Sequence, residues 1–526
     1  MLALPGLAHA ATYCVNASGC TGTSEPDLQT ALNAAAATTS VADTVHVGNP
    51  GVPTGSGWTY SDGGHAANQV DIIGAGPSST LLTDTGNPVL NVQGPGSTIS
   101  DLTVQLPQAG ASGIATSGSL SNVYVTSLDG GSHTQTGVSL SGTGGQHWTG
   151  GGISLPTTGS DFAIVRSAAP ETVDLEDLTI ATAAIALFPM PGDDVTVRRS
   201  SIESAIAAVN LGGHLTLDNV AFHGLVAPGP VPFVGTLPSG SFDAITDLNH
   251  ISAYGTNTSG TIGALDVHDS SGDSATVNVR NSIFRNFAES ISRSATTSGG
   301  SANVNVSYSD MDLIHTINTP NTNGATGDIN IGSGMIDADP LFTNPTGGDF
   351  SLKAGSPALD AGDPAGLLPG DSATDVLGAP RISNGRQDMG AVEFQVIPPP
   401  APPAPPAPLA PPAKDRLAPK LKLSKLPKSV KLKQLLKGLK FTVTTSEPSS
   451  VNATLAGAVR SVNLARHFDY TLAHKHLGQK SGKRRITLKV RRRVLGHSRR
   501  FTLRLTVVAT DASGNKTTVR RTIKVR

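Results

Sequence analysis

The 526-residue sequence predicts an all-β protein, in which a long repetitive solenoid precedes a small antiparallel β-sandwich. Three observations predict this fold class. The 59 glycines, 36 prolines and only 4% aromatic residues suit many short strands joined by turns, and they disfavour long helices. One short motif with a central Asp or Asn recurs through the first three quarters of the chain. Residues 414–526 instead alternate apolar and basic side chains.

Residues 1–10, MLALPGLAHA, are similar to the end of a secretory signal peptide. Three leucines form a short apolar region, and Ala8-His9-Ala10 fits the small-x-small cleavage pattern. The basic residues that normally come first are missing, so either the start codon lies upstream or the segment is not a signal. We expect export, to the medium or the cell surface. No later apolar run reaches the roughly 18 residues that a membrane span needs.

Cys14 and Cys20 are the two cysteines of the chain. In an exported protein, two cysteines this close together favour a local disulfide. Two free thiols are the alternative, and a metal site would need more ligands than this pair supplies.

The recurring motif places an apolar residue two positions before an Asp, an Asn or a substitute, and apolar residues resume afterwards. VNVRNSIFRN, residues 277–286, is a clear copy. The central residues of the copies are Asp101, Asn122, Asp177, Arg199, Asn219, Asn281 and Tyr308. A period of roughly 20–30 residues is typical of solenoids. Two longer gaps, of 55 and 62 residues, leave room for further copies.

The central Asp or Asn is expected where the chain turns a corner between two short strands. These residue types tolerate the left-handed backbone conformation that such a corner needs, and stacked copies can hydrogen-bond to one another. Each unit then contains a strand, a one-residue corner, a second strand and a turn, which is one coil of a parallel β-helix. Hairpin turns in a β-sandwich are the alternative, but they do not require one corner to be repeated.

Two stretches carry a resemblance to a known family. The start, TYCVNASGC followed by DLQTALNAAAA and DTVHVG, is similar to the capping helix and first coil of secreted bacterial proteins with the right-handed parallel β-helix, or pectin-lyase-like, fold. The end, DADPLFTNPTGGDFSLKAGSPALDAGD and then DMGAVEF, resembles the terminal segment of choice-of-anchor Q β-helix proteins. The resemblance implies a right-handed β-helix over residues 11–396.

Residues 397–413 include PPPAPPAPPAPLAPP, which predicts an extended polyproline spacer, with a proline-rich recognition ligand as the alternative. In residues 414–526, Ile486 and Leu488 face one way while Arg485 and Lys489 face the other, which indicates antiparallel strands. The ending VVATDASGNKTTVRRTIKV resembles the last hairpin of bacterial immunoglobulin-like or fibronectin-like modules.

Charge is divided unevenly along the chain. Residues 414–526 hold 29 Lys and Arg against 4 Asp and Glu, a net of +25, and the remainder holds 9 against 35, a net of −26. Such a division of charge affects which partners the chain binds and how soluble it is, but it does not predict the fold. We expect the basic module to associate with the envelope through an anionic wall polymer; acidic lipid, another copy's acidic β-helix and plain solubility remain open. No motif predicts specific nucleic-acid binding.

Enzymes of the resembling fold carry charged side chains outside one parallel sheet. We trace that sheet through the inward anchors Ile114, Val138, Ile153, Ile185, Ile206 and Ile291. The outward neighbours are Gly113, Gly137, Gly152, Ala184, Ala205 and Ser290 before the anchors, and Ala115, Ser139, Ser154, Ala186, Ala207 and Ser292 after them. None is charged or a histidine, which argues against an enzyme, although a register slip of one residue would exchange the two faces.

Two groups of polar residues are candidate sites. Asp193 and Asp194, with His214 on the following coil, form the candidate catalytic set, although the acidic pair also has the composition of a plain turn. Candidate calcium ligands, which otherwise shape the closing turns, are Asp337, Asp339, Asp360 and Asp363. No other cofactor is expected.

We predict a monomeric, secreted or cell-surface β-helix protein that binds or adheres to carbohydrate, either a polysaccharide or a cell-wall polymer. Neutral faces of Ser, Thr and Asn can hydrogen-bond sugars without any need for charge. A polysaccharide lyase or glycoside hydrolase with a site outside the traced sheet is one alternative, and a purely structural spacer is another.

Overall fold

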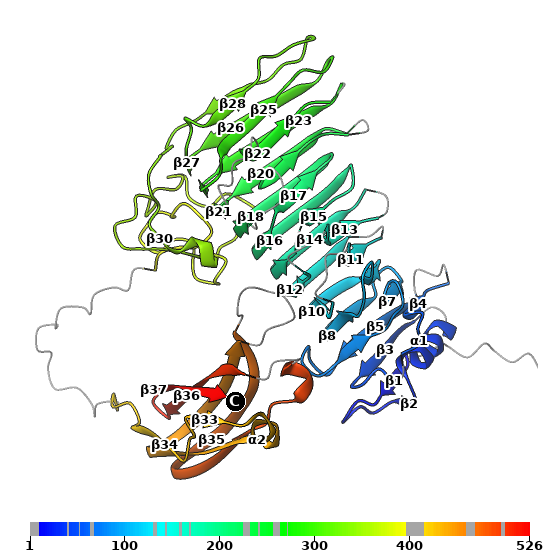
Figure 1. The fold of residues 1–526 in the computed structure, drawn as a ribbon, viewed down its shortest axis with the longest axis vertical. Coiled ribbons are helices and arrows are strands. Elements are labelled where there is room, and N and C mark those ends of the chain that lie inside the picture. The colour runs from blue at the N-terminus through cyan, green and yellow to red at the C-terminus, as the bar shows by residue number, and fades with distance from the viewer. Residues whose placement is uncertain are drawn as a thin grey trace, which may run out of the picture. The chain divides into compact units, whose positions relative to one another are not determined.

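The chain forms two compact units, Met1–Ile397 and Pro398–Arg526, in the computed structural model (Figure 1). The structure describes residues 10–38, 41–51, 53–63, 68–129, 134–142, 145–156, 160–167, 170–182, 184–224, 232–239, 242–255, 263–270, 272–395, 415–458, 469–495 and 500–526. Most of the predicted signal remnant (1–10) and all of the proline-rich spacer (397–413) therefore lie outside the described residues.

Two long sheets build the first unit, and every strand pairing within them is parallel. Sheet A has 18 strands: β1 (Thr12–Val15), β2 (Thr23–Glu25), β3 (Ala42–Val47), β5 (Gln69–Gly74), β6 (Leu81–Thr83), β8 (Thr98–Leu106), β10 (Ser119–Ser127), β12 (Gln146–Ser154), β14 (Thr172–Ala181), β16 (Asp193–Ser204), β18 (Gly213–Gly224), β20 (Ala244–Asn249), β21 (Ser252–Tyr254), β23 (Ser274–Arg280), β24 (Ile283–Arg285), β26 (Ser301–Ser307), β27 (Asp310–Met311) and β29 (Ile329–Ile331). Sheet B has 11: β4 (Trp58–Ser61), β7 (Leu90–Gln93), β9 (Ser112–Thr116), β11 (Thr136–Leu140), β13 (Phe162–Arg166), β15 (Ile185–Phe188), β17 (Ile206–Asn210), β19 (Val234–Thr236), β22 (Gly263–His268), β25 (Glu289–Ser294) and β28 (Thr316–Asn318). The predicted parallel β-helix is confirmed.

All predicted corners adopt the left-handed conformation. Their φ angles are 56° at Asp101, 53° at Asn122, 58° at Asp177, 44° at Arg199, 57° at Asn219, 53° at Asn281 and 46° at Tyr308. Gly150 (φ 70°) and His250 (φ 51°) divide the two long gaps in the repeat. Sheet A bends at this column of corners, so each coil has one strand segment before the corner, one after it, and a third in sheet B.

The interior is a stack of aliphatic side chains in register. Val197 on β16 lies beside Leu217 on β18, which lies beside Leu248 on β20, and all three are buried. Each coil thus covers the apolar residues of the next, at about 25 cal/mol per Å² of apolar surface removed from water. Phe233 contacts the rings of Phe222 and Phe284, with centroids 4.7 and 5.7 Å away.

Helix α1 (Leu28–Ala37) lies against β1, β3 and β4, as Figure 1 shows. It begins at Asp27, whose carboxylate accepts a hydrogen bond from the backbone N–H of Thr30 at 2.8 Å. Its apolar face, which includes Leu28 and Leu32, is completely buried. The helix therefore covers apolar residues of the first coil, as predicted.

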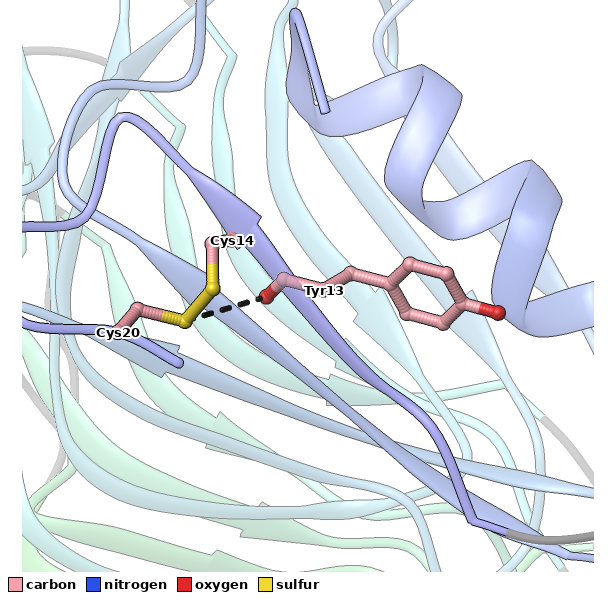
Figure 2. The surroundings of a disulfide bond; sticks show 3 residues. All are labelled: Tyr13, Cys14 and Cys20. Carbon is pink, nitrogen blue, oxygen red and sulfur yellow. Dashed lines mark hydrogen bonds between the residues drawn. A yellow bond between two sulfur atoms is a disulfide. The ribbon is translucent and has the colours of Figure 1, made fainter. Parts of the chain in front are cut away.

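A disulfide joins Cys14 and Cys20, as predicted from their spacing (Figure 2). Cys14 belongs to β1, and Cys20 precedes β2, which pairs with β1 in parallel. The bond thereby closes the short loop between the two strands, and Cys20 Sγ lies 3.9 Å from the carbonyl oxygen of Tyr13.

The terminal segment, residues 337–395, folds back along the column of corners. Its regular elements are β30 (Phe342–Asn344), the 3₁₀ helix η1 (Pro345–Gly347) and β31 (Asp349–Leu352). Asn281 at one corner accepts hydrogen bonds from the backbone N–H groups of Asp363 (2.6 Å) and Gly390 (2.7 Å). Apolar residues of the segment, among them Phe350 and Met389, pack on Ile283 of β24.

The second unit is a curled six-stranded sheet around its own core. Its elements are β32 (Leu421–Ser424), β33 (Ser429–Val430), α2 (Leu432–Lys437), β34 (Leu439–Ala458), β35 (Asp469–Leu488), η2 (Arg492–Leu495), β36 (Phe501–Asp511) and β37 (Lys516–Val525). All pairings are antiparallel except that of β33 with β37. The predicted alternation is confirmed, since Ile486 and Leu488 are buried while Arg485 and Lys489 are exposed.

None of the helices among the described residues combines the length and apolar character needed to cross a membrane.

Candidate functional site

The outer face of sheet B differs in part from the face traced in the sequence. Ile114, Val138 and Ile291 are inward anchors as predicted, and Ala115, Ser139 and Ser292 after them are half exposed. Gly113, Gly137 and Ser290, which were predicted to point outward before these anchors, are buried. Two anchors are wrong: Ile185 and Ile206 are half exposed, and the inward positions belong to Leu187 and Ala208. Ile153 is buried, but it lies in sheet A on β12, while β13 supplies the sheet B strand of that coil.

An apolar strip replaces the small neutral column at the middle of this face. Its half-exposed members are Phe162 and Val165 on β13, Ile185 and Phe188 on β15, and Ile206 and Val209 on β17. Phe162 and Phe188 meet edge to face, with ring centroids 5.6 Å apart. Periodicity could not place these strands because both of their faces are apolar, so alternation carries no information there.

Charged residues do occur at the outer face of sheet B, on β22, which the sequence trace omitted, and at the start of β25. Asp266 of β22 lies beside Ser292 in register, and its carboxylate is 2.8 Å from His268 Nε2. This contact raises the pKa of His268. Burial and the charge of Asp266 raise the pKa of Glu289, at the start of β25. The missed signal was the sequence Asp266-Val-His268, in which polar side chains alternate with an apolar one.

The candidate catalytic set is divided between the interior and the surface. Asp193 is buried, with its Oδ2 3.3 Å from Arg166 Nε, and it accepts a hydrogen bond from the Met190 N–H at 2.7 Å. Burial raises the pKa of Asp193. Asp194 points outward, and its carboxylate lies 3.9 Å from His214 Nδ1. Asp193 therefore supports the coil and lies apart from the surface pair.

A row of polar side chains, here called the polar ladder, continues from His214 across the outer face of sheet A. It consists of His214, Asp247, Asn278, Asn305 and Asn330. His214 Nε2 lies 2.7 Å from Asp247 Oδ2. Each Asn then donates from Nδ2 to the preceding member, at 2.7 Å to Asp247, 2.8 Å to Asn278 and 2.9 Å to Asn305.

Register explains the ladder. Asp247 on β20, Asn278 on β23, Asn305 on β26 and Asn330 on β29 are direct neighbours in the parallel pairing. The contact with Asp247 raises the pKa of His214. Burial opposes ionisation of Asp247, but its bonds to His214 and Asn278 outweigh it and lower the pKa of Asp247. Stacking of corner residues is confirmed where Asn122 Nδ2 donates to Asp101 Oδ1 at 2.7 Å. The polar ladder is a separate stack on the flank: Asp247, Asn278 and Asn305 each lie three residues before a corner.

The four candidate calcium ligands each contact different groups of the first unit. Asp337 pairs with Arg285 at 2.8 Å, Asp339 accepts from the Leu341 N–H, and Asp360 accepts from Asn384. Asp363 accepts a hydrogen bond from the Ala365 N–H at 2.9 Å, and its Oδ2 lies 3.7 Å from Arg280. These contacts are those of side chains that shape turns, and calcium binding here remains a prediction.

Three carboxylates converge in the second unit. Asp415, Glu447 and Asp511 place ligand oxygens within 4.8 Å of one another, close enough to share one cation. Asp511 already accepts hydrogen bonds from the N–H and the side chain of Asn515, at 2.9 and 2.8 Å. Sequence patterns do not reveal this cluster, because Asp415 and Glu447 are distant from Asp511 along the chain.

Comparison with known proteins adds no family to this description: no family model matches the chain, and no curated protein matches it either.

Proposed function

We propose that the first unit is an exported carbohydrate-binding β-helix and that the polar ladder is the centre of its binding surface. The observation that carries this proposal is the unbroken set of side-chain hydrogen bonds from Asn330 to Asp247. The resemblance of the terminal segment to choice-of-anchor Q β-helix proteins and the Cys14–Cys20 disulfide both support an extracytoplasmic location.

The ladder leaves hydrogen-bonding capacity for a ligand. An Asn amide offers two donors and two acceptor lone pairs, whereas Asn278 and Asn305 each use one donor and one acceptor within the ladder. One donor and one acceptor per amide therefore remain, repeated at about 4.8 Å from coil to coil. Because the amides already hold one another in place, binding costs little side-chain entropy. Such a surface suits a hydroxyl-rich chain that lies along the stack.

A glycan array probed with the full chain tests this function. We expect binding to a neutral or weakly acidic polysaccharide, and the triple variant N278A/N305A/N330A should weaken it at least tenfold. The matched control S112A/S139A/S292A alters the outer face of sheet B and should bind within twofold of the parent. Equal glycan affinity of the two variants, with unchanged thermal unfolding, would exclude the polar ladder as the binding surface. Failure of the parent to bind any glycan would favour the spacer alternative.

A hydrolase is the second candidate, supported by the environment of Glu289. A carboxyl whose pKa is raised by burial and by the charge of Asp266 has the character of a general acid. Incubation of the parent with any polysaccharide that it binds should then release reducing ends, and the E289Q variant should not. A parent that binds the polysaccharide but releases nothing would remove this candidate.

A further inference from the structure

The outer face of the β36–β37 hairpin carries a regular array of cations and hydroxyls. Its cations, here called the cationic ladder, are Arg504, Lys516, Arg520 and Lys524, and all four are exposed. Each lies opposite a threonine on the partner strand. The register pairs are Thr502 with Lys524, Thr522 with Arg504, Thr506 with Arg520, and Thr510 with Lys516.

The opposite face of the hairpin is fixed in the core of the second unit. Leu503 and Leu505 on β36, and Ile523 and Val525 on β37, are buried. Strand alternation then directs the cations outward from a rigid hairpin. The array is thus part of a packed sheet and keeps its spacing without a ligand.

The array gathers four cations on one face of a single hairpin. Among the described residues, no ion pair joins Lys516, Arg520 or Lys524 to a carboxylate of this unit. Placing a threonine opposite each cation avoids direct like-charge pairs across the strands, which are destabilising. It also sets a hydroxyl donor beside each cation.

From these features we propose that the cationic ladder binds a linear, phosphate-bearing polymer. Lys516, Arg520 and Lys524 recur every four residues, which is about 13 Å along a strand, and the ladder spans about 26 Å in a line. Arg504, on the neighbouring strand, lies level with Thr522, midway between Arg520 and Lys524. Lysine, arginine and threonine together supply the charge-assisted donors that phosphate oxygens accept.

The surface fits such a polymer better than a membrane or a nucleic acid. Among the described residues of the second unit, the large apolar side chains are buried or half buried except that of Leu417. A site that inserts into a bilayer exposes apolar residues, and single-stranded nucleic acid is held by aromatic stacking. The ladder instead offers charges and hydroxyls alone.

Titration of the full chain with inorganic polyphosphate tests the proposal. The variant K516Q/R520Q/K524Q should bind at least tenfold more weakly than the parent. The slope of log Kd against log salt should fall by roughly three, because each lost cation no longer releases a counterion. The matched control K433Q/K437Q/K475Q removes the same charge from exposed positions on α2 and β35, none of them opposite a threonine, and it should stay within about threefold of the parent.

A second variant separates the hydroxyls from the charge. T506V/T522V keeps strand propensity and net charge, and it should weaken polyphosphate binding severalfold with an unchanged salt slope. Equal losses in the two triple-glutamine variants would reduce the effect to net charge and overturn the proposal. So would tighter binding to phosphatidylglycerol vesicles or duplex DNA than to polyphosphate. The outcome is independent of the glycan proposal, because the Asn variants lie in the first unit.

Discussion

At the scale of single residues, the left-handed corner connects sequence and structure most directly. Asp and Asn adopt this conformation more easily than other non-glycine residues. Arg199 and Tyr308 are less suited to it, and each has a specific contact. Arg199 makes two hydrogen bonds to Asp177, both 2.9 Å, and the guanidinium of Arg386 lies over the Tyr308 ring at 6.0 Å. Local strain of this kind persists where the surroundings oppose relaxation.

Replacement of Asn281 by alanine should destabilise the first unit. Asn281 is completely buried, donates to Asn249 Oδ1 at 3.0 Å and accepts from the Asp363 N–H at 2.6 Å. Alanine leaves both partners unsatisfied in the interior, at about 1–3 kcal/mol each. We expect N281A to lower the free energy of unfolding by about 2–4 kcal/mol in a denaturant titration.

Asn323 provides a matched control for this experiment. It has the same φ of 53°, but it is exposed and donates one hydrogen bond, to the Thr296 carbonyl at 2.8 Å. N323A should cost about 1 kcal/mol or less. If both variants lost equal stability, the corner conformation itself would dominate, and the contacts with the terminal segment would contribute little.

At the scale of elements, the terminal segment buries charge where it meets the coils. Arg381 is completely buried, with Nη2 3.7 Å from Glu393 Oε2. Glu393 also accepts from the N–H groups of Ser383 (3.1 Å) and Asp388 (2.9 Å). Burial, followed by the charge of Asp388, raises the pKa of Glu393 to about 7. Burial raises the pKa of Asp388 to about 6. These carboxyls resist ionisation within the folded segment.

Docking of the terminal segment should therefore weaken as pH rises. A carboxyl with a raised pKa binds its proton more tightly in the folded state than in the unfolded chain. Its stabilising effect is complete below about pH 4 and is lost as pH rises through about 7. Hydrogen exchange across residues 375–395, corrected for intrinsic rates, should show less protection at pH 8 than at pH 6.

The E393Q variant isolates this effect from other titrating groups. Glutamine cannot ionise, so the difference in protection between pH 6 and pH 8 should shrink. The exposed control D349N should keep the parent profile. An unchanged profile in E393Q would assign the pH dependence to another group, such as Asp388.

At the scale of the whole molecule, the chain carries two large and opposite charges that almost cancel. The net charge is −1, although residues 414–526 contribute +25 and the remainder −26. Small net charge removes the general repulsion that keeps copies apart, while oppositely charged regions attract. Salt screens this attraction, with a Debye length of about 8 Å at 0.15 M and about 30 Å at 0.01 M.

Self-association should therefore depend on ionic strength. We expect a monomer at 0.15 M salt and reversible association at 0.01 M near pH 7, measured by sedimentation velocity. A truncated chain ending at residue 396 should stay monomeric at both concentrations, because its charge has one sign. A parent that sediments identically at both salt concentrations would contradict the prediction.

The sequence predicted the architecture better than the surface. Corners were recognisable because one residue type recurs where backbone geometry restricts the choice, and the alternation in residues 484–505 placed those strands correctly. Strands that are apolar on both faces, such as those containing Ile185 and Ile206, show no alternation from which their inward residues could be predicted. Asp247 and His214, 33 residues apart, meet only through the stacking of coils. Their contact depends on coil length, which varies along the chain and cannot be read locally.

The fold-back of the terminal segment separates the exit of the chain from the end of the stack. Ala391 donates to Ser252 Oγ at 2.8 Å, so the chain leaves the first unit beside β21, well before the last coil. The distance from helix α1 to this exit is then set by the number of coils between them. Each coil inserted or deleted there would change that reach by about 4.8 Å and leave the coils beyond the exit untouched. The number of early coils therefore sets the distance between the capped end and the point where the chain leaves the first unit.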